Sequence, residues 1–192
     1  MFFPLGHAKR FSKPSPVGPW SEVYNATSYR DACVQFGSVG RIAWLLDYTK
    51  TESEDCLFVN VWRPSGRGEK KNRTVMVWIH GGGFETGTIF SSMFDGRYLA
   101  HQGDVVVVSI NYRLGPFGFL YGGTEGAPGN VGLHDQILAL QWVRDNIEHF
   151  GGDPTKVTVF GESAGAISAG ALVISPLARG LFKRAILQSG TP

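Results

Sequence analysis

Residues 156–165 read KVTVFGESAG. The first half of this stretch predicts a buried strand, and the small apolar residues that continue to Ile174 predict a helix. Between them, Gly161-x-Ser163-x-Gly165 lies on the connecting turn, where only glycine neighbours let strand and helix pass closely enough to hold a serine in a strained backbone conformation. The pattern predicts an exposed serine hydroxyl at the carboxyl edge of a sheet. The alternative is a glycine-rich connection with an incidental serine.

Further strands and helices alternate around this turn. Apolar, β-branched runs predict strands over residues 57–62, 74–79, 104–111 and 184–188. A helix is predicted over residues 133–150, because apolar residues recur there at intervals of three and four before Gly151 ends it. This alternation predicts an α/β fold, with a mostly parallel sheet and flanking helices, that occupies residues 1–192 as one domain.

The composition excludes several classes of protein. Of the 192 residues, 43% are hydrophobic and 18% are charged, which is typical of a folded protein. The net charge of +2 is too small for the basic surface that nucleic-acid binding requires. The apolar run Val105–Val108 is far shorter than the roughly 18 residues of a membrane helix. We therefore expect no nucleic-acid partner and no membrane-spanning segment.

A second glycine-rich stretch follows the predicted strand 74–79. It reads His80-Gly81-Gly82-Gly83-Phe84, and its glycines leave backbone N–H groups unshielded, so that two of them can donate to one developing oxyanion. The N–H of Ala164, at the start of the helix after the serine, supplies a third donor. A phosphate-binding loop is the less favoured alternative, because no Gly-Lys-Ser/Thr follows the glycines.

Four stretches together resemble the type-B carboxylesterases, the α/β-hydrolase family that includes the cholinesterases. They are Glu54–Trp62, Asn111–Gly115, Pro128–Pro154 and Phe160–Gly165. The resemblance extends from about residue 5 to residue 190. It implies a carboxylic ester hydrolase that acts through a serine nucleophile and an acyl-enzyme, on a small-molecule ester. The non-catalytic, neuroligin-like adhesion branch and a cholinesterase proper remain alternatives.

The resemblance also implies roles for individual residues. Ser163 would be the nucleophile, with an oxyanion hole formed by Gly82, Gly83 and Ala164. Near this site, His80 would shape the loop, and Glu162 would tune the histidine of the full protein or bond nearby water. A disulfide would join Cys33 to Cys56, and structural ion pairs would join Arg10 to Glu54 and Arg113 to Asp135.

The chain departs from the family's catalytic pattern. In this fold the acid and the histidine of the triad follow the serine, but residues 164–192 contain no Asp, Glu or His. We therefore expect an internal fragment that needs the remainder of the same polypeptide and is inactive alone. Its sheet would have an uncovered edge, which favours aggregation and marginal folding.

Other features concern ligands and location. Trp44 lies between Cys33 and Cys56, in the loop where a cholinesterase keeps its choline-binding tryptophan. The spacing from Trp44 to Cys56 differs from that of the cholinesterases, so packing within the loop is the favoured interpretation of Trp44. No C-x-x-C pair or clustered His motif indicates a cofactor or metal. The two cysteines and the glycosylation sequons at Asn25 and Asn72 favour a secreted or extracellular protein, although no signal peptide opens the chain.

Overall fold

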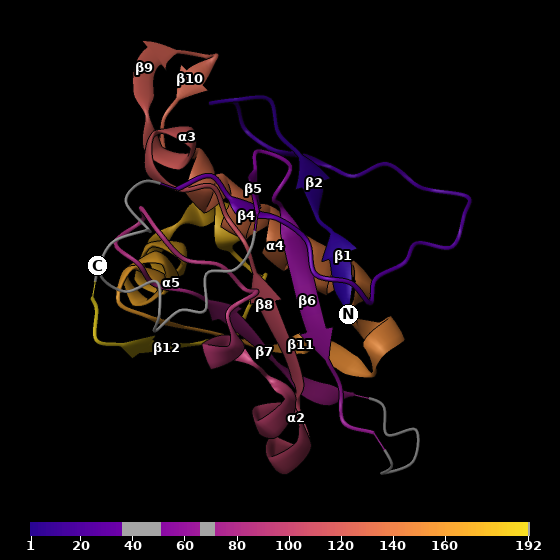
Figure 1. Ribbon diagram of the computed structural model, residues 1–192. Coiled ribbons are helices and arrows are strands. Elements are labelled where there is room, and N and C mark those ends of the chain that lie inside the picture. The colour runs from indigo at the N-terminus through magenta and orange to yellow at the C-terminus, as the bar shows by residue number, and fades with distance from the viewer. Residues whose placement is uncertain (36–50, 66–71, 192) are drawn as a thin grey trace.

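The computed structural model describes residues 1–35, 51–65 and 72–191, and its centre is a six-stranded sheet (Figure 1). The strands lie in the order β1-β6-β8-β7-β11-β12. Their bounds are β1 (Phe2–Pro4), β6 (Phe58–Trp62), β8 (Val106–Ile110), β7 (Arg73–Ile79), β11 (Gly152–Glu162) and β12 (Arg184–Gln188). All five strands predicted from the sequence are therefore present.

The sheet is mixed. Strands β8, β7, β11 and β12 run parallel to one another, whereas β6 pairs antiparallel with both β8 and β1. The mostly parallel sheet predicted from the sequence is confirmed, and β6 and β1 form its antiparallel part. An apolar run indicates that a strand is buried but carries no information about its direction.

Helices and short strand pairs surround the sheet. The helices are α2 (Arg97–Gly103), α3 (Gly115–Phe119), α4 (Val131–Asn146) and α5 (Ala164–Ile174), with the 3₁₀ turns η1 (Ser92–Phe94), η2 (Ile147–Phe150) and η3 (Pro176–Ala178). The two-stranded sheets are β2 (Gly6–His7) with β3 (Ser15–Pro16), β4 (Ala32–Cys33) with β5 (Glu52–Ser53), and β9 (Tyr121–Thr124) with β10 (Ala127–Pro128). Within the described ranges, no helix has both the length and the apolar character needed to cross a bilayer.

The predicted helix over residues 133–150 is α4 followed by the tighter turn η2. Gly151 ends it in the left-handed conformation, with φ 79°, and its N–H donates to the carbonyl of Glu148. Strand β11 then begins at Gly152, earlier than the predicted Lys156, and an irregularity separates the pair Gly152–Arg73 from the regular register with β7. The predicted end of the helix, at Phe150 just before Gly151, is therefore confirmed.

The core lies between one face of the sheet and the helices α4 and α5. Alternate side chains of the central strands, represented by Val77, Val108 and Val159, are fully buried there against residues such as Leu140 and Ala169. Side chains alternate across a strand, so the intervening residues face the opposite side of the sheet. At the carboxyl ends of β7 and β11, this packing fixes the positions of the two glycine-rich turns.

Candidate active site

Ser163 lies on the sharp turn between β11 and α5, as the sequence predicts. Its backbone has φ 54° and ψ −122°, a conformation that residues other than glycine rarely adopt. Its N–H donates a 2.9 Å hydrogen bond to the carbonyl of Gln188 on β12, and its own carbonyl accepts a 3.0 Å bond from the N–H of Ile167. These bonds from neighbouring elements hold the strained residue in place, and its side chain remains partly exposed.

The glycines on either side of Ser163 have no room for a side chain. A Cβ on Gly161 would lie 2.4 Å from the carbonyl atoms of Gly165, and a Cβ on Gly165 would lie 2.1 Å from the carbonyl oxygen of Ile79. Strand β11, helix α5 and the end of β7 therefore meet backbone to backbone. This close approach is the physical reason for the glycine spacing in the sequence.

The loop after β7 lies directly against this turn. A Cβ on Gly81 would be 3.1 Å from the Cβ of Ser163 and 2.6 Å from the carbonyl oxygen of Glu162. Gly82 and Gly83 follow with φ values of 112° and 64°, which favour glycine, and both are exposed. The structure thus brings together the serine and the glycine loop, which are 80 positions apart in the sequence.

His80 is buried beneath the loop. It has no exposed surface, and its ring stacks on that of Tyr112 with centroids 4.5 Å apart. Burial lowers the pKa of His80 to about 4, although a hydrogen bond with the Gly81 carbonyl, 2.9 Å from Nδ1, opposes the shift. Gly87 closes over the ring, because a Cβ there would be 2.2 Å from Nδ1. A neutral, enclosed imidazole fits a residue that shapes the loop.

The remaining predicted site residues flank the turn. Ala164 is buried as the first residue of α5, and Glu162 is exposed at the end of β11. Trp44 lies outside the described residues. In the two sequons, the acceptor residues Asn25 and Asn72 are both exposed.

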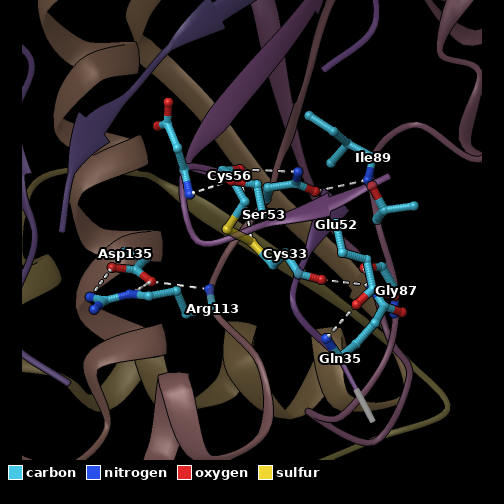
Figure 2. Close-up of a disulfide and its surroundings, with 12 residues drawn as sticks. Cys33, Gln35, Glu52, Ser53, Cys56, Gly87, Ile89, Arg113 and Asp135 are labelled. Atoms are coloured by element: carbon cyan, nitrogen blue, oxygen red, sulfur yellow. Dashed lines mark hydrogen bonds and ion pairs between the residues drawn. A yellow bond between two sulfur atoms is a disulfide. The ribbon is translucent and has the colours of Figure 1, made fainter. Parts of the chain in front are cut away.

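The predicted disulfide between Cys33 and Cys56 is present and is connected to the glycine loop (Figure 2). Gln35 donates from Nε2 to the carbonyls of Cys33 (3.0 Å) and Gly87 (3.2 Å), and accepts a 3.1 Å bond from the N–H of Gly87. Asn111 donates to the carbonyl of Cys56 at 3.2 Å. No local pattern singles out Gln35, because its role depends on a contact across 52 positions; its only signal in the sequence is its place two residues after Cys33.

Both predicted ion pairs are confirmed. Arg113 and Asp135 form a buried pair with two side-chain bonds of 2.7 and 2.8 Å, and the Arg113 N–H adds a third to the same carboxylate. Burial raises the pKa of Asp135, while its hydrogen bonds from Arg113 oppose the shift. The pair between Arg10 and Glu54 is exposed, and the arginine lowers the pKa of Glu54.

An open, largely apolar groove of about 610 Å³ begins beside the loop. It runs from Gly83 and Phe84 over Phe119 to Leu133 and Ile167. Because one wall is the loop and another is α5, the groove adjoins the turn that carries Ser163.

This arrangement of sheet, serine turn and glycine loop defines an α/β-hydrolase. The chain is similar to the solved structure of a thermophylic PNB esterase, with a TM-score of 0.91 and 47% identity, over 98% of this chain and 39% of that one. A model of the carboxylesterase family matches residues 3–192. The chain belongs to the carboxylesterase family.

Curated relatives are similarly close in sequence. Acetylcholinesterase from Danio rerio is 53% identical over 196 aligned positions, which cover 98% of this chain and 30% of the relative. Cholinesterase from Mus musculus is 49% identical, with coverage of 98% and 32%. The chain thus spans about a third of the length of these relatives.

Proposed function

We propose that the complete protein is a carboxylic ester hydrolase with Ser163 as its nucleophile. The observation that carries this proposal is the contact between the strained serine turn and the Gly81–Gly83 loop, with 3.1 Å between the Ser163 Cβ and the position of a Cβ on Gly81. Strain at a partly exposed serine is typical of a functional position. The relatives named as cholinesterases and esterases support the same reaction class.

In the proposed reaction, the Ser163 hydroxyl oxygen attacks the ester carbonyl carbon. The hydroxyl proton passes to a histidine, and the carbonyl oxygen takes the negative charge, which the N–H groups of Gly82, Gly83 and Ala164 stabilise. The tetrahedral adduct then breaks its bond to the alkoxy oxygen, which leaves with that proton as an alcohol. Water hydrolyses the acyl-enzyme by the same steps and restores the serine.

The proton acceptor in this scheme is not His80. Its pKa of about 4 leaves it a weak base near neutral pH, and its ring is enclosed by Tyr112 and Gly87. We propose that the histidine and its acidic partner belong to the remainder of the polypeptide, since the relatives are about three times longer than this chain. The chain alone is then expected to be inactive.

The groove beside Gly83 supports an apolar acyl or alkyl group in the substrate, and we propose general carboxylic esters as the substrate class. Choline esters are the second candidate, because relatives named acetylcholinesterase are up to 53% identical. The adhesion alternative is not favoured, because a protein without catalysis has no need of a strained serine at this turn.

A fluorophosphonate probe and two ester substrates test the proposal. We expect a form extended to the length of the relatives to be labelled at Ser163 and to hydrolyse p-nitrophenyl acetate, whereas the 192-residue chain shows neither activity. Ser163→Ala should abolish labelling. The matched control Ser175→Ala, at the other end of α5, should retain it. Absence of labelling in the extended form would refute the proposal. Faster turnover of acetylthiocholine than of p-nitrophenyl acetate would favour choline esters as the substrate class.

We further propose that the protein matures in an oxidising, secretory compartment. The disulfide between Cys33 and Cys56 and the two exposed sequons support this location. When the chain is expressed behind a secretion leader, Asn25→Gln and Asn72→Gln should each remove one endoglycosidase-sensitive increment of mass. Asn146→Gln, outside any sequon, is the control, and a mass unaffected by endoglycosidase in every form would contradict the proposal.

A further inference from the structure

The side chain of Gln35 holds the far end of the loop that begins at His80 (Figure 2). Its Nε2 donates to the Gly87 carbonyl, and its Oε1 accepts from the Gly87 N–H, so the amide pairs with the Gly87 backbone as a neighbouring strand would. Gly87 is buried, and Gln35 is only 7% exposed. Water therefore has little access to these two bonds.

Gln35 is itself fixed to the disulfide-bonded segment. Its Nε2 also donates to the carbonyl of Cys33 at 3.0 Å, and the disulfide joins Cys33 to Cys56. The N–H of Gln35 donates a 3.3 Å bond to the side chain of Glu52 on β5, the strand that pairs with β4. The amide therefore has little freedom to move with the loop, and it can act as an anchor for it.

Gly87 in turn supports the first glycines of the loop. A Cβ on Gly87 would lie 2.2 Å from His80 Nδ1 and 2.7 Å from the carbonyl oxygen of Gly81. The loop also closes on itself just before Gly87, because the Gly82 carbonyl accepts bonds from the N–H of Thr86 at 2.9 Å and from its hydroxyl at 3.2 Å. A displacement of Gly87 would therefore move the loop backbone that carries the proposed oxyanion donors.

We propose that Gln35 is a positioning residue in the ester hydrolysis, because it holds the loop that presents the Gly82 and Gly83 N–H groups to the oxyanion. This role rests on the proposed function and adds to it a residue outside the serine turn and the glycine loop. Negative charge develops on the carbonyl oxygen only as the tetrahedral adduct forms, so misplaced donors lower kcat more than they weaken substrate binding. An amide with a purely structural role would affect stability and leave kcat unchanged.

Gln35→Met tests this role in the form extended to the length of the relatives, because methionine is of similar size and has no amide. Loss of a whole oxyanion donor costs on the order of 10²-fold in kcat, so for displaced donors we expect a fall of about tenfold with p-nitrophenyl acetate, and a KM within about twofold. The control Asn146→Ala removes a 2.9 Å side-chain bond to the Trp142 carbonyl and should leave kcat unchanged. Equal kcat in Gln35→Met and the unsubstituted form would overturn the role of Gln35, whereas absence of turnover in every form would refute the proposed function itself.

Hydrogen exchange in the 192-residue chain tests the same link without catalysis. The Thr86 N–H, which is bonded to the Gly82 carbonyl, should exchange about tenfold faster in Gln35→Met and keep its rate in Asn146→Ala. In the unsubstituted chain, the side-chain NH₂ of Gln35 should exchange about tenfold more slowly than that of the exposed Gln102. An equal rate for these two side chains would overturn the proposal even if Gln35→Met failed to fold, and so would a Thr86 rate that is unchanged in a folded Gln35→Met.

Discussion

The hydroxyl of Tyr112 donates a 2.9 Å hydrogen bond to the main-chain carbonyl of His80, while the two rings stack 4.5 Å apart. His80 follows β7 directly, and Tyr112 follows β8 by two positions. The contact therefore joins the ends of two adjacent parallel strands at the base of the glycine loop. Both side chains are fully buried, so water cannot replace the bond.

Tyr112→Phe removes this hydrogen bond and leaves the stacked ring in place. We expect the free energy of unfolding to fall by about 1 kcal/mol, because the His80 carbonyl loses a buried donor. Urea denaturation measures the change. Tyr98→Phe, at a side chain that is 74% exposed, is the control and should lie within about 0.5 kcal/mol of the unsubstituted chain.

Stability should decrease as the pH falls from about 6.5 to about 4, through the titration of His80. Its pKa is about 4 in the folded protein and 6.5 in the unfolded chain, so the unfolded chain binds the proton first as the pH falls. The difference corresponds to a loss on the order of 3 kcal/mol that is complete near pH 4.

Denaturation curves of the unsubstituted chain and His80→Gln at several pH values isolate this contribution. The difference in unfolding free energy between the two proteins should change across the window from pH 6.5 to 4. His149→Gln, at an exposed position, should retain the original pH dependence. Parallel curves for His80→Gln and the unsubstituted chain would contradict the burial argument.

The buried and exposed ion pairs should differ strongly in their contributions to stability. Asp135→Asn leaves the Arg113 guanidinium buried without a counter-charge, and we expect a loss of about 3–5 kcal/mol in unfolding free energy. Glu54→Gln breaks the exposed pair with Arg10 and should cost less than about 1 kcal/mol. Similar losses in the two variants, measured by chemical denaturation, would refute this ranking.

The edge strand β12 should govern aggregation of the 192-residue chain. Its Ile186 is 44% exposed, and within the described part of the chain β12 pairs only with β11. Ile186→Lys places a charge on this edge and should lower light scattering on concentration. Ile174→Lys, at a 76% exposed residue of α5, is the matched control for added charge alone, so an equal effect would exclude a special role of the edge.

The serine turn and the alternating strands could be predicted because their signals are local. The glycine spacing around Ser163 is a pattern of five consecutive residues, although one of the contacts that requires it is with the distant Ile79, and β-branched runs mark buried strands wherever they pair. The direction of β6 could not be predicted, since burial alone sets its composition. The contacts of Gln35 with Gly87 depend on which distant segments become neighbours, which no local pattern specifies.

Gly165 packs closely on the Ile79 carbonyl, at the end of the strand that leads into the glycine loop. The serine turn and the glycine loop are therefore expected to move together. No side chain lies between the two backbones to absorb a displacement, so a shift of β7 along its axis is transmitted to Ser163. Substitutions deep in β7 can therefore alter the distance between the serine oxygen and the loop amides without touching either. Directed evolution of this scaffold should find activity changes at such distant strand positions.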